Sequence, residues 1–122
     1  MANPFSVHRS PAGEFVVLTL EGYLDAHTAP QFEEAVQREM DQGNLRLIVD
    51  GPHLTYISSA GLGVFMSFIE EIREMGGYIK ISGITTKVKQ VFDILGFNEL
   101  FDMVEDIDAA KQRFVESPTR EN

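Results

Sequence analysis

The sequence contains no cysteine, and its basic residues are few. The absence of cysteine excludes disulfides, thiolate zinc sites, iron–sulfur clusters and cysteine nucleophiles, and it is compatible with a reducing compartment. Lys and Arg total 10 against 19 Asp and Glu, which gives a formal net charge of −9. Nucleic acids and anionic lipid surfaces both attract basic faces, so we expect neither as a partner.

Long apolar runs are missing as well. No stretch approaches the ~18 consecutive apolar residues of a membrane span, and residues 1–15 lack the apolar centre of a signal peptide. We therefore expect a cytoplasmic protein without a membrane span. The chain has 122 residues, of which 43% are apolar, which is enough to bury a core. We predict one domain over residues 1–116, followed by a polar tail over residues 117–122.

Predicted strands and helices alternate along most of the chain. Apolar and β-branched segments bounded by turn residues predict strands at residues 5–9, 14–23, 45–49, 78–81 and 100–104. Apolar residues at helical spacing predict helices between Thr28 and Gly43, Ser59 and Met75, Thr85 (or Thr86) and Gly96, and from Asp106 or Asp108 onward. The order β-β-α-β-α-β-α-β-α predicts a single-domain α/β fold with a mixed, mainly parallel sheet of four to five strands and about four helices.

Three local signals set the expected boundaries of these elements. Residues 10–13, Ser-Pro-Ala-Gly, predict the turn of an N-terminal hairpin. Thr28 and Gln31 have the spacing of a helix capping box. Residues 50–52, Asp-Gly-Pro, are expected to end the central strand, so that a loop follows up to Ile57.

The segment from Leu54 to Gly63 is the strongest candidate for chemistry. Two serines, Ser58 and Ser59, and two glycines lie where a helix begins. A helix N-terminus presents unpaired N–H groups and the positive end of the helix dipole, so a phosphate could be bound there or attached covalently. Serine is also a favoured N-cap, so a purely structural role stays open. Neither a P-loop nor a Gly-x-Ser-x-Gly nucleophile elbow is present.

The same segment resembles a known signature. Residues 54–65, Leu-Thr-Tyr-Ile-Ser-Ser-Ala-Gly-Leu-Gly-Val-Phe, are similar to the signature loop of the STAS domain, a family that includes anti-sigma factor antagonists and domains of sulfate transporters. The resemblance covers residues 5–115. It includes a Gly-x-Leu-Asp turn at 22–25, the strands at 47–50 and 78–83, and the helix and Gly-Phe turn within 88–101.

The resemblance implies a regulatory role. In antagonist members of this family, a serine at the start of this helix is phosphorylated by a partner anti-sigma factor that is a serine kinase. The matching position is Ser59, and Ser58, which stands where the family usually has Asp, is the second candidate. The unphosphorylated chain would bind the kinase and free a sigma factor, phosphorylation would release it, and a serine phosphatase could reverse the switch. The implied partner-binding residues are Asp25, Thr55, Tyr56, Ser58, Ser59 and Gly61.

Two other interpretations remain open from the sequence. A small enzyme or nucleotide-binding α/β protein could use residues 58–63, although no His or Lys lies near them in sequence to act as a base. A STAS-type scaffold could act in a larger signalling or transport assembly without being phosphorylated.

His8, His27 and His53 show no metal-ligand spacing. We therefore expect no metal, no cofactor and no catalytic residue.

Overall fold

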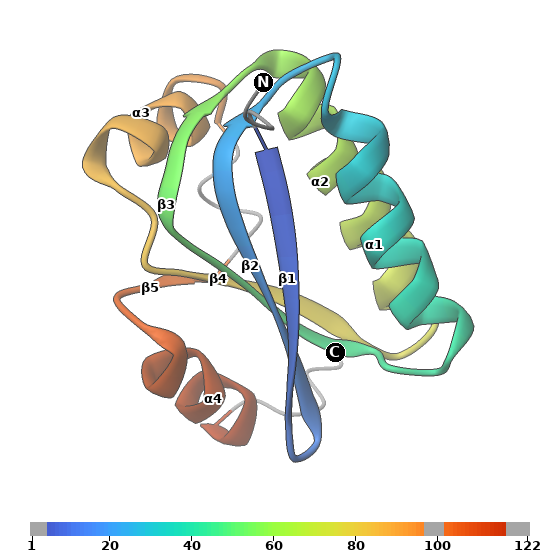
Figure 1. Ribbon diagram of the computed structural model, residues 1–122. Coiled ribbons are helices and arrows are strands. Elements are labelled where there is room, and N and C mark those ends of the chain that lie inside the picture. Colours follow the sequence, from blue (N-terminus) through green and yellow to red (C-terminus); the bar gives the residue numbers. More distant parts are fainter. Residues whose placement is uncertain (1–4, 97–101, 117–122) are drawn as a thin grey trace.

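The computed structural model describes residues 5–96 and 102–116. They form β1 (Phe5–Ala12), β2 (Phe15–Leu24), α1 (Ala29–Asp41), β3 (Arg46–Ile57), α2 (Ser59–Glu74), β4 (Tyr78–Ser82), α3 (Thr86–Ile94), β5 (Asp102–Val104) and α4 (Ile107–Glu116) (Figure 1). The predicted order of strands and helices is confirmed. The expected polar tail and residues 100–101 of the predicted last strand lie outside the described residues.

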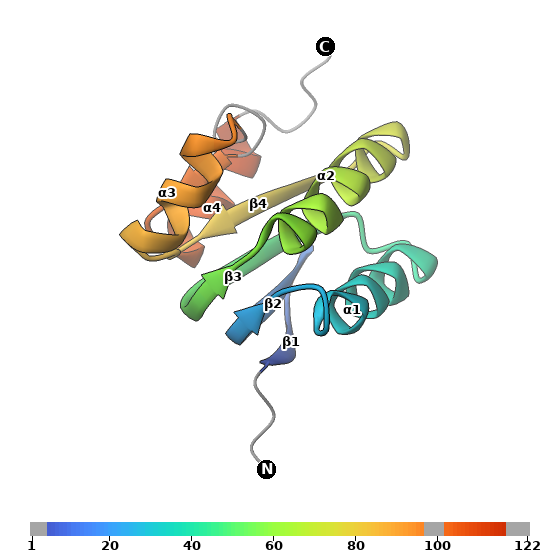
Figure 2. The same ribbon diagram turned by 90° about the horizontal axis from the view of Figure 1, so that it is seen from above.

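The five strands form one sheet in the order β1-β2-β3-β4-β5. β1 is antiparallel to β2, and each later neighbour pair is parallel, so the predicted mixed, mainly parallel sheet is confirmed. α1 and α2 lie side by side over one face, and α4 covers part of the other (Figures 1 and 2). No helix within residues 5–96 and 102–116 is long and apolar enough to cross a membrane.

The main core lies between the sheet and the pair α1 and α2. The predicted apolar stripe of α1 is confirmed, because Phe32, Val36 and Met40 are all buried. Phe65 of α2 contacts Phe32 and also Phe92 of α3, with ring centroids 4.9 Å and 5.6 Å apart. A smaller cluster on the opposite face packs α4 against the sheet. Aromatic contacts therefore fix α2 between α1 and α3.

β3 is longer than the sequence predicted. The expectation that residues 50–52 end this strand is wrong, because β3 continues to Ile57. Its pairing with β4 stops at Asp50, opposite Ser82, whereas its pairing with β2 continues to the register pair Leu24 and Ile57 with two irregularities on the way. Beyond Asp50 only one neighbouring strand remains, so the proline at position 52 interrupts no ladder with β4.

The predicted capping box at Thr28 is also wrong. No side-chain bond caps α1 at Thr28. Its hydroxyl instead donates to the carbonyl of Tyr23 at 2.7 Å and accepts from the backbone N–H of Asp25 at 2.9 Å. Thr28 is buried, and it uses its hydroxyl to close the turn between β2 and α1.

The hairpin turn is shorter than predicted. β1 runs to Ala12, so the turn consists of Gly13 and Glu14 rather than residues 10–13. Pro11 fits within β1 because this strand, at the end of the sheet, pairs with β2 alone among the described strands. Gly13 has φ of +67°, a conformation that favours glycine.

Side-chain caps decide two alternatives that the sequence left open. The hydroxyl of Thr85 accepts from the backbone N–H of Val88 at 3.2 Å, so Thr85 rather than Thr86 caps α3. The carboxylate of Asp106 accepts from the backbone N–H of Ala109 at 2.8 Å, so Asp106 rather than Asp108 precedes α4. Both helices therefore begin where a short polar side chain can satisfy a free N–H group.

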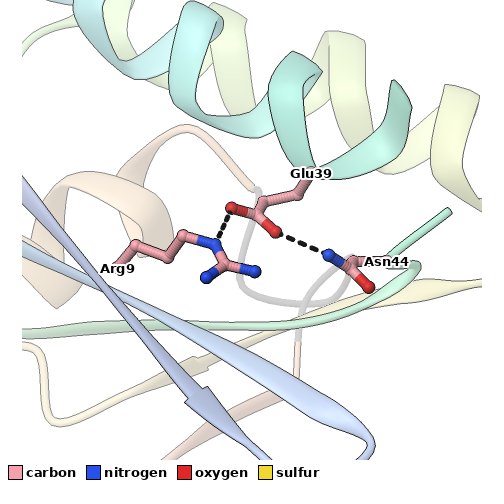
Figure 3. Close-up of polar contacts among 3 residues, drawn as sticks. All are labelled: Arg9, Glu39 and Asn44. Atoms are coloured by element: carbon pink, nitrogen blue, oxygen red, sulfur yellow. Dashed lines mark hydrogen bonds and ion pairs between the residues drawn. The ribbon is translucent and has the colours of Figure 1, made fainter. Parts of the chain in front are cut away.

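A buried carboxylate joins α1 to the hairpin. Glu39 is 1% exposed, and its two oxygens accept from Nε of Arg9 at 2.5 Å and Nδ2 of Asn44 at 2.9 Å (Figure 3). Arg9 belongs to β1, and Asn44 lies just before β3. Because a buried carboxylate is unfavourable without partners, this arrangement holds the end of α1 against β1.

We expect Arg9→Ala to lower the free energy of unfolding by about 2 kcal/mol, because it leaves Glu39 buried with one partner. The value is below that for a fully buried pair, since the Arg9 side chain is 43% exposed and water can take its place in part. Arg38→Ala is the matched control, because its pair with Glu34 is exposed on both sides, and it should change stability by less than ~0.5 kcal/mol. Urea unfolding measures both, and equal losses would contradict a special role for Glu39.

Candidate functional site

The candidate site lies where the carboxyl ends of β2 and β3 meet the first turn of α2. The backbone N–H of Ser58 donates to the carbonyl of Leu24 at 2.9 Å, which joins the loop after β3 to the end of β2. Asp25 directly follows Leu24, so the turn before α1 and the start of α2 lie at the same edge of the sheet. Parallel strands that feed crossover helices generally bring their carboxyl ends together in this way.

Ser58 is the N-cap of α2. Its backbone is extended, with φ of −100° and ψ of 173°, and its hydroxyl accepts from the backbone N–H of Gly61 at 3.3 Å. Its carbonyl accepts from the N–H of Leu62, which is the first bond of the helix. The side chain is half-buried. Ser58 therefore satisfies the structural role that the sequence left open for this segment.

Ser59 is the first residue of α2, and its side chain is exposed. Among the described residues, its hydroxyl makes no hydrogen bond. The first turn of α2 contains no acidic residue, so no carboxylate of the helix itself offsets the positive end of its dipole. The hydroxyl is therefore open to another molecule and lies where added negative charge is favoured.

Two glycines in the first turns of α2 have different surroundings. Gly61 is buried, and a Cβ added there would lie 2.8 Å from the carbonyl oxygen of Leu24 and 3.1 Å from Cγ1 of Ile57. A Cβ on Gly63 would meet nothing within 4 Å. Gly61 thus allows α2 to approach the strand ends closely, whereas Gly63 leaves an open patch on the exposed side of the helix.

Asp25 organises the turn between β2 and α1. Its Oδ1 accepts from the backbone N–H groups of His27 at 2.9 Å and Thr28 at 3.2 Å, as in an Asx turn. Its carbonyl accepts from the N–H of Ala29 at 2.8 Å. Asp25 therefore has a local structural role in addition to its position beside the start of α2.

A shallow pocket of about 510 Å³ lies between the carboxyl ends of β2 and β3 and the first turn of α3. It is lined by Tyr23, Asp25, Thr55, Tyr56 and Lys87. The rings of Tyr23 and Tyr56 meet edge to face, with centroids 6.1 Å apart, and the hydroxyl of Thr55 donates to the carbonyl of Gly22 at 3.2 Å. The sheet thus brings together three residues that the sequence identified, Asp25, Thr55 and Tyr56.

The other identified residues lie at the adjacent helix start and do not line this pocket. Ser58 and Gly61 are turned toward the strand ends, and Ser59 is turned toward solvent. The sequence missed Tyr23 and Lys87. Tyr23 is the variable position of the Gly-x-Leu-Asp turn, and Lys87 lies in the first turn of α3, so no sequence spacing connects it with the others.

The site offers a hydroxyl without a base of its own. Among the described residues, no His, Lys, Asp or Glu side chain is hydrogen-bonded to Ser59. Within residues 5–96 and 102–116, no three His, Asp or Glu side chains are grouped so that they could hold a metal ion. The arrangement suits a serine that the catalytic groups of another protein activate better than a catalytic serine activated by a base of its own chain.

Comparisons with known proteins show which family this chain is similar to. Residues 8–110 match the family described as the STAS domain. BtrV of Bordetella bronchiseptica, named as a candidate anti-sigma factor antagonist, is 30% identical over 99 residues, which cover 81% of this chain and 85% of BtrV.

The fold is shared with solved structures of the anti-sigma factor antagonist SpoIIAA. The unphosphorylated form superposes with a TM-score of 0.78 at 21% identity, covering 91% of this chain and 97% of that one. The phosphorylated form, from Bacillus, gives a TM-score of 0.69 at 22% identity, covering 88% of this chain and 98% of that one. Both structures are similar to this chain over nearly all of their own length.

We expect Gly61→Ala to destabilise the protein by about 1–3 kcal/mol, because the added methyl group forces α2 away from Leu24. We expect Gly63→Ala to stabilise it by about 0.5–1 kcal/mol, because alanine favours a helix and the position is open. The two substitutions add the same methyl group to the same helix, so chemical unfolding compares them directly. Equal stability of the two variants would show that the contact with Leu24 does not constrain the helix.

Proposed function

This chain belongs to the STAS domain family, and on that premise we propose that it is an anti-sigma factor antagonist. In this proposal it binds an anti-sigma serine kinase when unphosphorylated and is released when Ser59 is phosphorylated. The observation that carries the proposal is the exposed hydroxyl of Ser59 on the first residue of α2. The name of BtrV and the existence of SpoIIAA in a phosphorylated form support it.

The two serines differ in how they are engaged, and this supports Ser59 as the acceptor. The hydroxyl of Ser58 accepts a hydrogen bond from Gly61 and is half-buried, so a phosphoryl group there would displace the N-cap. The hydroxyl of Ser59 has no such bond among the described residues. Phosphorylation of Ser59 therefore leaves the cap of α2 in place.

The chemistry requires the kinase to supply what the site lacks. The oxygen of Ser59 attacks the γ-phosphorus of ATP, the bond to the β-phosphate oxygen breaks, and ADP leaves. A base of the kinase accepts the hydroxyl proton, since no described side chain of this chain is placed to do so. The donor ATP places the reaction in the cytoplasm, and a serine phosphatase would restore the hydroxyl by hydrolysis.

The switch follows from the charge of the phosphate. A phosphoserine adds about −1.5 to −2 charges near neutral pH. On the free chain this charge is stabilised by the N-terminus of α2, whereas in a packed interface it must be desolvated or paired. A hundredfold loss of affinity corresponds to about 2.8 kcal/mol, which one unpaired interfacial charge can supply. Release then needs no refolding of the chain.

We expect Ser59→Ala to bind an anti-sigma serine kinase as the unphosphorylated wild type does, and Ser59→Asp to bind at least about tenfold more weakly. The kinases to test are purified proteins of this class encoded in the source genome, with affinity measured by calorimetry. With ATP added, mass spectrometry should find one phosphoryl group on the wild type and none on Ser59→Ala.

Ser58→Ala is the matched control for the acceptor. It removes the N-cap and should lower stability by about 1 kcal/mol, yet it should still be phosphorylated at Ser59. Phosphorylation of Ser59→Ala at Ser58 would contradict the choice of acceptor. Equal binding by wild type, Ser59→Ala and Ser59→Asp would remove the switch and leave the unphosphorylated scaffold as the better description.

A further prediction concerns the extent of the change on phosphorylation. Because the phosphate is added to an exposed first-turn position, we expect only local effects on the free chain. Backbone amide chemical shifts of the phosphorylated and unphosphorylated protein should differ around residues 58–63 and at the neighbouring turn after β2. Large shift changes in α4, on the opposite face of the sheet, would indicate a conformational switch instead.

A further inference from the structure

The pocket at the ends of β2 and β3 is lined by one basic residue, Lys87 of α3, and by two exposed tyrosines, Tyr23 and Tyr56. We propose that this pocket seats an acidic side chain of the partner kinase against Lys87, with Tyr23 and Tyr56 packing around it. The pocket would thus select among kinases by charge. This proposal rests on the proposed function, and it adds the chemistry by which the partner is recognised.

Lys87 has no counter-ion among the described residues, although the chain is rich in carboxylates. Asp and Glu number 19 against 10 Lys and Arg, and several cations of the described residues are paired with them: Arg9 with Glu39, Arg38 with Glu34, Arg46 with Glu14, and Lys89 with Asp93. Lys87 forms no ion pair with a described residue. Its charge is therefore available to a carboxylate from outside the chain.

The position of Lys87 in α3 is unfavourable for the isolated protein. It is the second residue of the helix, and the first turn contains no acidic residue. A cation there faces the positive end of the helix dipole, whereas a carboxylate would be stabilised. A residue that opposes the local preference and pairs with no described residue points to a role outside the fold.

Asp25, the other charged residue of the pocket, is already engaged within the chain. Its Oδ1 accepts two backbone hydrogen bonds in the turn before α1. Lys87 has no comparable contact among the described residues. The pocket therefore presents one carboxylate whose Oδ1 is held by its own turn and one ammonium group that pairs with no described residue, and an incoming anion would bind the ammonium group.

The two tyrosines have the features of an interface anchor. Tyr23 is 53% exposed and Tyr56 is 45% exposed, although large aromatic side chains are usually more buried. They contact each other edge to face, so their rings are held in place before a partner arrives. Aromatic rings that exclude water from a nearby ion pair strengthen it, because the local dielectric falls.

Two lining residues of the pocket lie close in the chain to the segment that carries Ser59. Tyr56 precedes Ser59 by three positions at the end of β3, and the bond from Ser58 to the carbonyl of Leu24 holds Tyr23 and Asp25 beside the same loop. An interface of ordinary size covers about 800 Å² on each partner. A kinase that places its active site on Ser59 would therefore also cover the pocket.

The test measures affinity for the purified anti-sigma serine kinases of the source genome, without ATP, so that the chain stays unphosphorylated. Lys87→Glu should weaken binding about tenfold or more and reduce its dependence on salt. Lys111→Glu makes the same charge change in α4 on the opposite face, and it should alter affinity less than about twofold. Lys87→Glu should also raise the melting temperature of the free chain slightly, which separates lost binding from lost folding.

Each outcome decides the proposal. Restoration of Lys87→Glu binding by a Glu→Lys or Asp→Lys substitution on the kinase would support it directly. Equal weakening by Lys87→Glu and Lys111→Glu would show that only net charge matters and would overturn it. Unchanged binding by Lys87→Glu, with wild-type binding intact, would overturn the pocket and leave the proposed function standing. If no kinase binds the wild type, both proposals fail together.

Discussion

The close approach of α2 to the carbonyl of Leu24 is the constraint on which the candidate site depends. One backbone hydrogen bond, from Ser58 to that carbonyl, and one missing side chain, at Gly61, allow the helix to begin directly on the strand end. A larger residue at position 61 would collide with the carbonyl oxygen. The hydrogen bond of Ser58 and the close approach at Gly61 both involve the backbone of α2. Together they set the direction in which Ser58 and Ser59 point.

The start of α2 separates two hydroxyls that are neighbours in sequence. Ser58 is turned inward and caps the helix, and Ser59 is turned outward and has no hydrogen bond among the described residues. One serine thus caps the helix N-terminus, and the other exposes its hydroxyl at that N-terminus. If the proposed switch operates, the phosphate is stabilised by the same helix whose start it occupies, and its effect is confined to whatever docks there.

Several features were predictable because they arise from local periodicity. The alternation of strands and helices, the mainly parallel sheet and the buried stripe of Phe32, Val36 and Met40 follow from spacing alone. The predictions for Thr28 and Pro52 failed for a tertiary reason. Thr28 uses its hydroxyl to close a turn with Tyr23, and Pro52 lies in β3 beyond the point where pairing with β4 ends.

By itself, the sequence determined the fold class, and its signature loop indicated Ser59 as the candidate acceptor through the resemblance to the STAS domain, because the amphipathic pattern and the loop are short-range features. Only the tertiary structure decided that Ser58 is the cap, that Ser59 is exposed, and that Lys87 joins Tyr23 and Tyr56 in one pocket. The three pocket residues Tyr23, Tyr56 and Lys87 come from β2, β3 and α3, and the first and last of them are more than 60 positions apart. No local pattern can encode that proximity, because it is created by the parallel pairing of strands whose ends the helices then cover.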